Sequence, residues 1–182
     1  YSDQRPPRVL ILVPTRELVV QVAAEIEKLT TYLSIRTLSV YGGTNMNTQK
    51  QDIYDGCDIL VATPGRIYDL CMTGILRLKD IQKLVIDECD EMLDLGFRPQ
   101  LERILELLPS KRQNLLFSAT ITEDVDLLTA TFFSQVEKII AAPTGTPLKN
   151  IEQSAYNVVN FYTKFNLLSG LLEGEQAPER VF

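Results

Sequence analysis

The most informative segment of the chain is Lys83-Leu84-Val85-Ile86-Asp87-Glu88-Cys89-Asp90, in which an apolar run passes directly into acidic residues. The run 83–86 is too short for a helix and lacks the polar alternation of a half-exposed strand, so it predicts a buried strand. In an open parallel sheet, ligands bind outside the carboxyl ends of the strands, where these acids would project. The alternative is that the acids only cap a following helix.

Similar apolar, β-branched runs recur along the chain. They occupy residues 9–13, 37–41, 58–62, 114–118 and 138–141. Segments with helical spacing lie between them, of which 16–33 and 99–108 each carry one apolar stripe. Strands that alternate with helices predict right-handed crossovers, and therefore an α/β fold in which helices cover both faces of a parallel sheet.

The pattern changes near residue 142, because two prolines and one glycine occur within residues 142–147. This composition is typical of a linker. A strand-like run (154–159) and a helix-like run (165–172) follow it. We therefore expect a partial first domain over residues 1–141, a linker over 142–150 and the beginning of a second domain over 151–182.

Composition narrows the classes of function. A net charge of −6 gives no basic field that would attract nucleic acid, so any such contact depends on a few placed groups. Histidine is absent, which excludes Ser-His and Cys-His nucleophiles, and three dispersed cysteines argue against a disulfide framework or a zinc site. No apolar run reaches membrane-spanning length, and residues 1–8 lack the apolar stretch of a signal peptide. We expect a soluble intracellular protein, cytoplasmic in preference to nuclear.

Asp87 and Glu88 suit chemistry on phosphates. An aspartate at a strand end can hold Mg²⁺, directly or through water, beside the phosphates of a nucleotide. A glutamate next to it can polarise the attacking water. These two residues are therefore the candidate catalytic pair.

The chain resembles the DEAD-box RNA helicases at five points, in the order that the family has them. The matching segments are Pro14-Thr15-Arg16-Glu17-Leu18 (motif Ia), Gly42-Gly43 (the paired-glycine element), Thr63-Pro64-Gly65-Arg66 (motif Ib), Asp87 to Asp90 (motif II) and Ser118-Ala119-Thr120 (motif III). The resemblance implies a RecA-like first domain followed by the start of a second. It also implies an ATP-dependent RNA helicase, an RNA-stimulated ATPase that unwinds or remodels RNA and RNA-protein complexes, with ATP and Mg²⁺ as cofactors.

The resemblance also assigns roles to residues. Asp87 would hold Mg²⁺ through water, while Glu88 would activate the attacking water and Asp90 would couple the sites through hydrogen bonds with Ser118 and Thr120. The sugar-phosphate backbone of RNA would be gripped, without sequence specificity, by Thr15, Arg16, Gly42, Gly43, Thr63, Gly65 and Arg66. Simpler alternatives are turn geometry for the glycines, helix capping for the two threonines, and ion pairs within the domain for the two arginines.

Two departures from the family pattern affect this interpretation. Cys89 replaces the usual alanine of motif II, a spelling shared with a group of messenger-RNA export helicases, and we expect it to be a small buried residue. The chain also has no GxxxxGK[ST] phosphate loop. We therefore expect a piece of a longer protein that hydrolyses ATP negligibly by itself. The remaining alternatives are an ATPase-inactive RNA-binding or scaffold relative and a related motor that acts on DNA.

Overall fold

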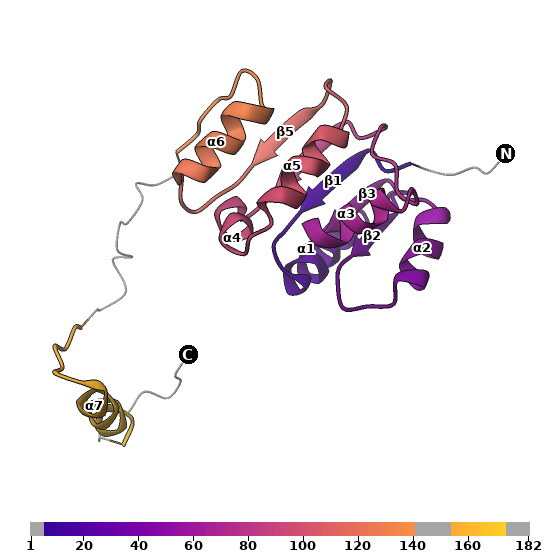
Figure 1. Cartoon of the computed structure of the whole chain (residues 1–182). Coiled ribbons are helices and arrows are strands. Elements are labelled where there is room, and N and C mark those ends of the chain that lie inside the picture. Colours follow the sequence, from indigo (N-terminus) through magenta and orange to yellow (C-terminus); the bar gives the residue numbers. More distant parts are fainter. Residues whose placement is uncertain (1–5, 141–153, 174–182) are drawn as a thin grey trace. The chain divides into compact units, whose positions relative to one another are not determined.

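The computed structural model describes residues 6–140 and 154–173 of the 182-residue chain. Its centre is a sheet of five parallel strands in the order β2-β3-β1-β4-β5 (Figure 1). The strands are β1 (Val9–Leu12), β2 (Thr37–Val40), β3 (Ile59–Ala62), β4 (Lys83–Ile86) and β5 (Gln113–Leu116). The first strand is therefore central, and the chain winds from it toward each edge in turn.

Helices connect the consecutive strands, as the crossover rule for parallel sheets requires. They are α1 (Arg16–Leu29), α2 (Met46–Tyr54), α3 (Pro64–Met72), α4 (Cys89–Asp94) and α5 (Arg98–Leu107). Two further helices, α6 (Glu123–Phe132) and α7 (Phe161–Glu173), follow the last strand. The α/β fold with a parallel sheet, predicted from the alternation of short apolar runs and helical stripes, is confirmed.

Successive side chains of the central strands β1 and β3 enter two different hydrophobic clusters, because they point to opposite faces of the sheet. Leu10 and Leu12 of β1 are fully buried in the larger cluster, which α3, α5 and α6 complete. Val13 belongs to the smaller cluster, with Val19 and Ala23 of α1. Helices thus cover both faces, and the core between them fixes where each strand ends.

Two predicted strands are wrong within the described residues. Residues 138–140 form no strand; Ile139 is exposed, and the Lys138 ammonium pairs with the Asp126 carboxylate at 2.8 Å instead. Residues 154–159 form no strand either. The first helix also ends at Leu29 rather than at residue 33, because the Thr30 hydroxyl donates to the Ile26 carbonyl at 2.8 Å and closes the last turn. Apolar content alone does not make a strand where no partner strand lies beside it.

The chain divides into two compact units, residues 1–144 and 145–182. Within the described part of the second unit, α7 includes the helix that its apolar spacing predicted, and none of its side chains is buried. The predicted linker at 142–150 lies outside the described residues. Among the described helices, none combines the length and the hydrophobicity that crossing a bilayer requires.

Candidate functional site

The five motifs lie at the carboxyl ends of the five strands, directly after the last residue or two of each strand. The register aligns the last residues of all strands: Leu12 pairs with Ala62 and Ile86, Val40 with Ala62, and Ile86 with Leu116. Each motif begins within the next few residues of its strand. The strand order therefore places motif II beside motif III, after β4 and β5. It places the paired-glycine element beside motif Ib, after β2 and β3.

Motif II is held by backbone hydrogen bonds from both sides. The Asp87 N–H donates to the Leu12 carbonyl at 3.0 Å, and the Cys89 N–H donates to the Phe117 carbonyl at 3.1 Å. Between them Glu88 has left-handed backbone angles, φ 53° and ψ 52°, which are unfavourable for a residue with a side chain. The anchored neighbours hold this conformation, and the Glu88 side chain is exposed at the strand end.

Asp87 fits the role of a magnesium ligand. Its carboxylate is half-buried at the end of β4, and one oxygen accepts the Glu88 N–H at 3.0 Å, which orients the group. The described residues contain no group of three acidic, cysteine or histidine side chains that could enclose a metal. Mg²⁺ does not need such a cage, because it commonly binds through one or two carboxylates, several waters and phosphate oxygens.

Motifs II and III are joined by a short hydrogen-bond network. One Asp90 carboxylate oxygen accepts from the Thr120 N–H at 2.8 Å and from the Thr120 hydroxyl at 2.6 Å. The Ser118 hydroxyl oxygen accepts from the Asp90 N–H at 3.2 Å, and the hydroxyl itself donates to the Thr120 carbonyl at 2.7 Å. The predicted hydrogen bonds between these motifs are therefore present, while their coupling role stays a prediction.

This network shifts the acidity of Asp90. Burial alone would raise its pKa, but the two hydrogen bonds from Thr120 stabilise the charged form and lower the pKa from 3.8 to about 2. Cys89 next to it is fully buried, as expected, and burial with the Asp90 charge raises the pKa of its thiol to about 11. Cys89 is therefore a packing residue rather than a nucleophile.

Motif Ia combines a helix cap with an exposed cation. Thr15 is the N-cap of α1, and its hydroxyl oxygen accepts the Leu18 N–H at 3.3 Å. The Arg16 side chain is 57% exposed and pairs with exposed Glu17 at 3.6 Å, a weak contact. A Cβ atom on Gly43 would lie 3.7 Å from the Arg16 guanidinium, so the paired-glycine element lies beside this cation.

Motif Ib is mostly buried. Thr63 is the N-cap of α3 but makes no capping hydrogen bond through its side chain, and Gly65 lies against the Phe97 ring. Arg66 is only 9% exposed. Its guanidinium donates to the Gln49 side-chain oxygen at 2.7 Å and to the Thr44 carbonyl at 3.1 Å, so its partners in the domain are not acids. Sequence reasoning missed Gln49, which no motif spacing distinguishes from its polar neighbours.

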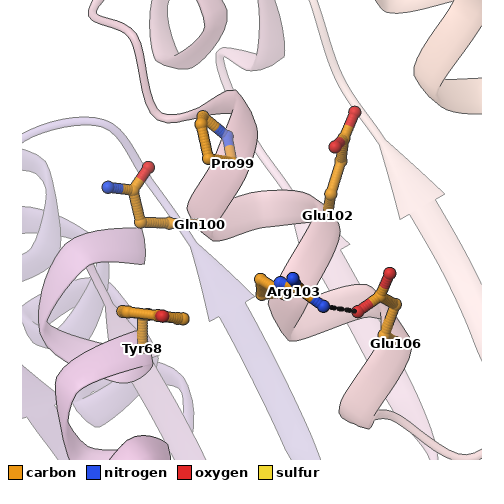
Figure 2. A pocket seen from close by; sticks show the side chains of 6 residues that line it. All are labelled: Tyr68, Pro99, Gln100, Glu102, Arg103 and Glu106. Atoms are coloured by element: carbon orange, nitrogen blue, oxygen red, sulfur yellow. Dashed lines mark hydrogen bonds and ion pairs between the residues drawn. The ribbon is translucent and has the colours of Figure 1, made fainter.

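A separate pocket of about 410 Å³ lies between α3 and α5 (Figure 2). It is lined by Tyr68, Pro99, Gln100, Glu102, Arg103 and Glu106. None of these residues belongs to the five motifs, and Arg103 is already paired with Glu106 at 3.0 Å. The candidate site is therefore the surface at the carboxyl ends of the strands and not this pocket.

Comparison with known proteins shows the family to which the chain belongs. The family model described as DEAD/DEAH box helicase matches residues 2–128. The ATP-dependent RNA helicase DbpA of Bacillus subtilis (strain 168) is 38% identical over 173 residues, which are 95% of this chain and 36% of that protein. The structure of the yeast DEAD-box splicing factor Prp28 superposes with a TM-score of 0.68 at 38% identity, over 71% of this chain and 31% of that one.

The chain spans about a third of the length of the relatives that it matches. The matched residues 2–128 contain all five segments identified in the sequence, each of which follows the end of a strand. The five-stranded parallel sheet is the RecA-like fold of the solved relative. The chain belongs to the DEAD/DEAH box helicase family.

Proposed function

We propose that the full-length protein containing this chain is an RNA-stimulated ATPase that unwinds or remodels RNA, with ATP and Mg²⁺ as cofactors. The observation that carries the proposal is the placement of Asp87 and Glu88 at a strand end, level with motifs Ia, Ib and III. Open parallel sheets bind nucleotides outside the carboxyl ends of their strands.

Asp87 and Glu88 divide the chemistry of hydrolysis. The oriented Asp87 carboxylate would hold the metal, which would neutralise charge on the phosphate oxygens. Glu88 accepts the proton of the attacking water; its side chain is exposed and makes no capping hydrogen bond with α4, so it is available as a base. The anchored backbone around it fixes the position from which the side chain extends.

The residues that follow β1, β2 and β3 bind the RNA backbone. Thr15, Arg16, Gly42, Gly43, Thr63, Gly65 and Arg66 surround it, either as direct contacts or as supports. Hydroxyls, a guanidinium and backbone N–H groups at helix N-termini are the donors that phosphate oxygens accept. Such contacts carry no base information, which agrees with a helicase that acts on many sequences.

The Asp90-Thr120-Ser118 network transmits the state of one site to the other. It ties the start of α4, next to the catalytic pair, to the segment that follows β5. Three short polar side chains at hydrogen-bond distance respond to a small displacement between these segments. Hydrolysis at Asp87 and Glu88 can thereby change how motif III is held.

The direct test is Glu88→Gln in the full-length protein. The change keeps the shape of the side chain but removes the base, so RNA-stimulated ATP turnover should fall ~10²–10⁴-fold while ATP and RNA affinities stay unchanged. Glu91→Gln, an exposed carboxylate on the same short helix, is the matched control and should retain turnover. Near-normal turnover of Glu88→Gln would remove Glu88 from the mechanism, and RNA binding without any turnover in the unaltered protein would favour an ATPase-inactive scaffold.

A further inference from the structure

The loop that carries the paired glycines needs external support to keep one conformation. It comprises residues 41–45, between β2 and α2. Gly42 and Gly43 are exposed, and Gly43 has a φ of +80°, in the region that residues with side chains rarely adopt. Glycine pairs are flexible in an unfolded chain, so ordering this loop has a high entropic cost. Two side chains outside the loop supply the contacts that offset this cost.

Gln49 of α2 is the first of them. It is 6% exposed, although it stands in a polar segment of the sequence. Its side-chain amide nitrogen donates to the Tyr41 carbonyl at 3.2 Å and to the Thr44 hydroxyl at 2.7 Å, and its oxygen accepts from Arg66 at 2.7 Å. Both amide hydrogens and the oxygen are therefore used, and the two donor contacts span the glycine pair.

Arg66 of α3 is the second. One arm of its guanidinium donates to Gln49 and the other to the Thr44 carbonyl at 3.1 Å. No carboxylate takes part in this network, so the buried cation depends on an amide and a carbonyl oxygen for its stabilisation. Both arms are directed at the loop and its support, which leaves little of the side chain for a surface phosphate.

Arg16, in contrast to Arg66, is exposed to solvent. More than half of its side chain is exposed, it pairs with an exposed neighbour, Glu17, and Gly43 lies beside its guanidinium. The position of the loop 41–45 therefore determines what lies beside the exposed Arg16 guanidinium. The two arginines of motifs Ia and Ib have different tasks.

We propose that Gln49 and Arg66 are positioning residues, which hold the loop 41–45 beside Arg16 so that the loop and Arg16 together receive the RNA phosphates. This inference rests on the RNA-binding surface of the proposed function and adds to it a supporting residue, Gln49, that lies outside the five motifs. Arg16 contributes charge to binding, whereas Gln49 and Arg66 contribute geometry.

The experiment compares five variants of the full-length protein, Arg66→Ala among them, in RNA-binding isotherms at several salt concentrations, with a single-stranded RNA as the probe. Gln49→Met keeps length but cannot hydrogen-bond, and Gln51→Met makes the same change at an exposed position of the same helix. Arg66→Lys keeps the charge but loses the fork. Arg16→Ala removes the exposed charge. Melting curves and amide hydrogen exchange of residues 41–45 accompany each variant.

Gln49→Met and Arg66→Lys should each weaken RNA binding about tenfold, equally for all sequences, with the salt slope unchanged and with faster exchange in residues 41–45. Gln51→Met should behave as the unaltered protein. Arg16→Ala should lower the salt slope by roughly 0.7, the value for one phosphate contact on a single strand. The isotherms are recorded well below the lowest melting temperature, so that loss of folded protein does not imitate weaker binding.

The outcomes separate the two proposals. If Arg16→Ala lowers the salt slope while Gln49→Met and Arg66→Lys bind normally, the positioning role is wrong and the RNA surface stands. If Arg66→Lys binds normally but Arg66→Ala lowers the salt slope, Arg66 contacts a phosphate directly and the inference is overturned. If none of the variants changes affinity or slope, the RNA-binding surface itself is misplaced.

Discussion

Asp90 shows how a single residue can serve stability and communication at once. Its carboxylate accepts two hydrogen bonds from Thr120, and its backbone N–H donates to Ser118. A carboxylate in this position keeps its charge to lower pH than a free one, with a pKa of about 2 in the folded protein. Motif III therefore contributes to the free energy of folding through Asp90, in addition to any role in coupling.

Acid unfolding tests this contribution. Because the folded pKa of Asp90 lies below its ordinary value of 3.8, the unfolded chain binds the proton more readily. The stabilisation is present above about pH 4 and is lost as the pH falls through about 2. We expect Asp90→Asn to lower the free energy of unfolding at pH 5, and the difference from the unaltered chain to shrink steadily as the pH approaches 2.

Urea unfolding of both proteins at half-unit pH steps measures this difference. Asp94→Asn, at an exposed position of the same helix, is the control for the general effect of removing one negative charge. An Asp90→Asn difference that did not depend on pH, or that Asp94→Asn reproduced, would show that the network does not hold the Asp90 charge.

At the level of elements, the two threonines that begin α1 and α3 differ in what they do for their helices. Thr15 caps α1 through its side chain, whereas Thr63 makes no capping hydrogen bond through its side chain to α3. Thr15→Ala should therefore lower the free energy of unfolding by about 1 kcal/mol, the usual cost of losing an N-cap, and Thr15→Ser should restore most of it.

Thr63→Ala should cost less than Thr15→Ala in the same denaturation series, since no cap is lost. Each variant also serves as the other's comparison in RNA binding, because both threonines border the proposed RNA surface. Equal destabilisation by the two alanine substitutions would contradict the distinction between them. A loss of RNA affinity in Thr63→Ala without loss of stability would point to direct contact by its hydroxyl.

The elements that the sequence predicted well are those with an unambiguous apolar signal. Each of the five strands overlaps a short apolar run, although Gln113 and Leu115 of β5 are exposed, and α1 and α5 carry clear apolar stripes. Helix α2 is mostly polar, so periodicity gave no sign of it, and with it the support by Gln49 remained hidden. The motifs predicted a set of candidate residues that the structure places after the strand ends. They did not predict the left-handed backbone of Glu88 or the burial of Arg66, because both depend on contacts between distant segments.

At the scale of the whole molecule, the sheet is unevenly protected. Strand β5 pairs with β4 on one side, and within the described residues no strand pairs with its other side. Two large apolar side chains lie exposed at this strand and just after it: Leu115 is 43% and Phe117 53% exposed. An open edge with exposed apolar residues is a site where strands of other molecules can add.

We therefore predict that this 182-residue chain associates with itself through β5, and that Leu115→Lys reduces the association. A lysine on an edge strand opposes strand addition because its charge would have to be desolvated or placed beside a like charge. Leu107→Lys is a closely matched control, since it makes the same change in residue and charge at a side chain that is 45% exposed but stands on helix α5. Sedimentation velocity over a range of protein concentrations should show a smaller associated fraction for Leu115→Lys than for Leu107→Lys. An equal decrease in both would attribute the association to net charge or to general hydrophobicity, and a chain that stays monomeric at all concentrations would show that the edge of β5 does not recruit a partner.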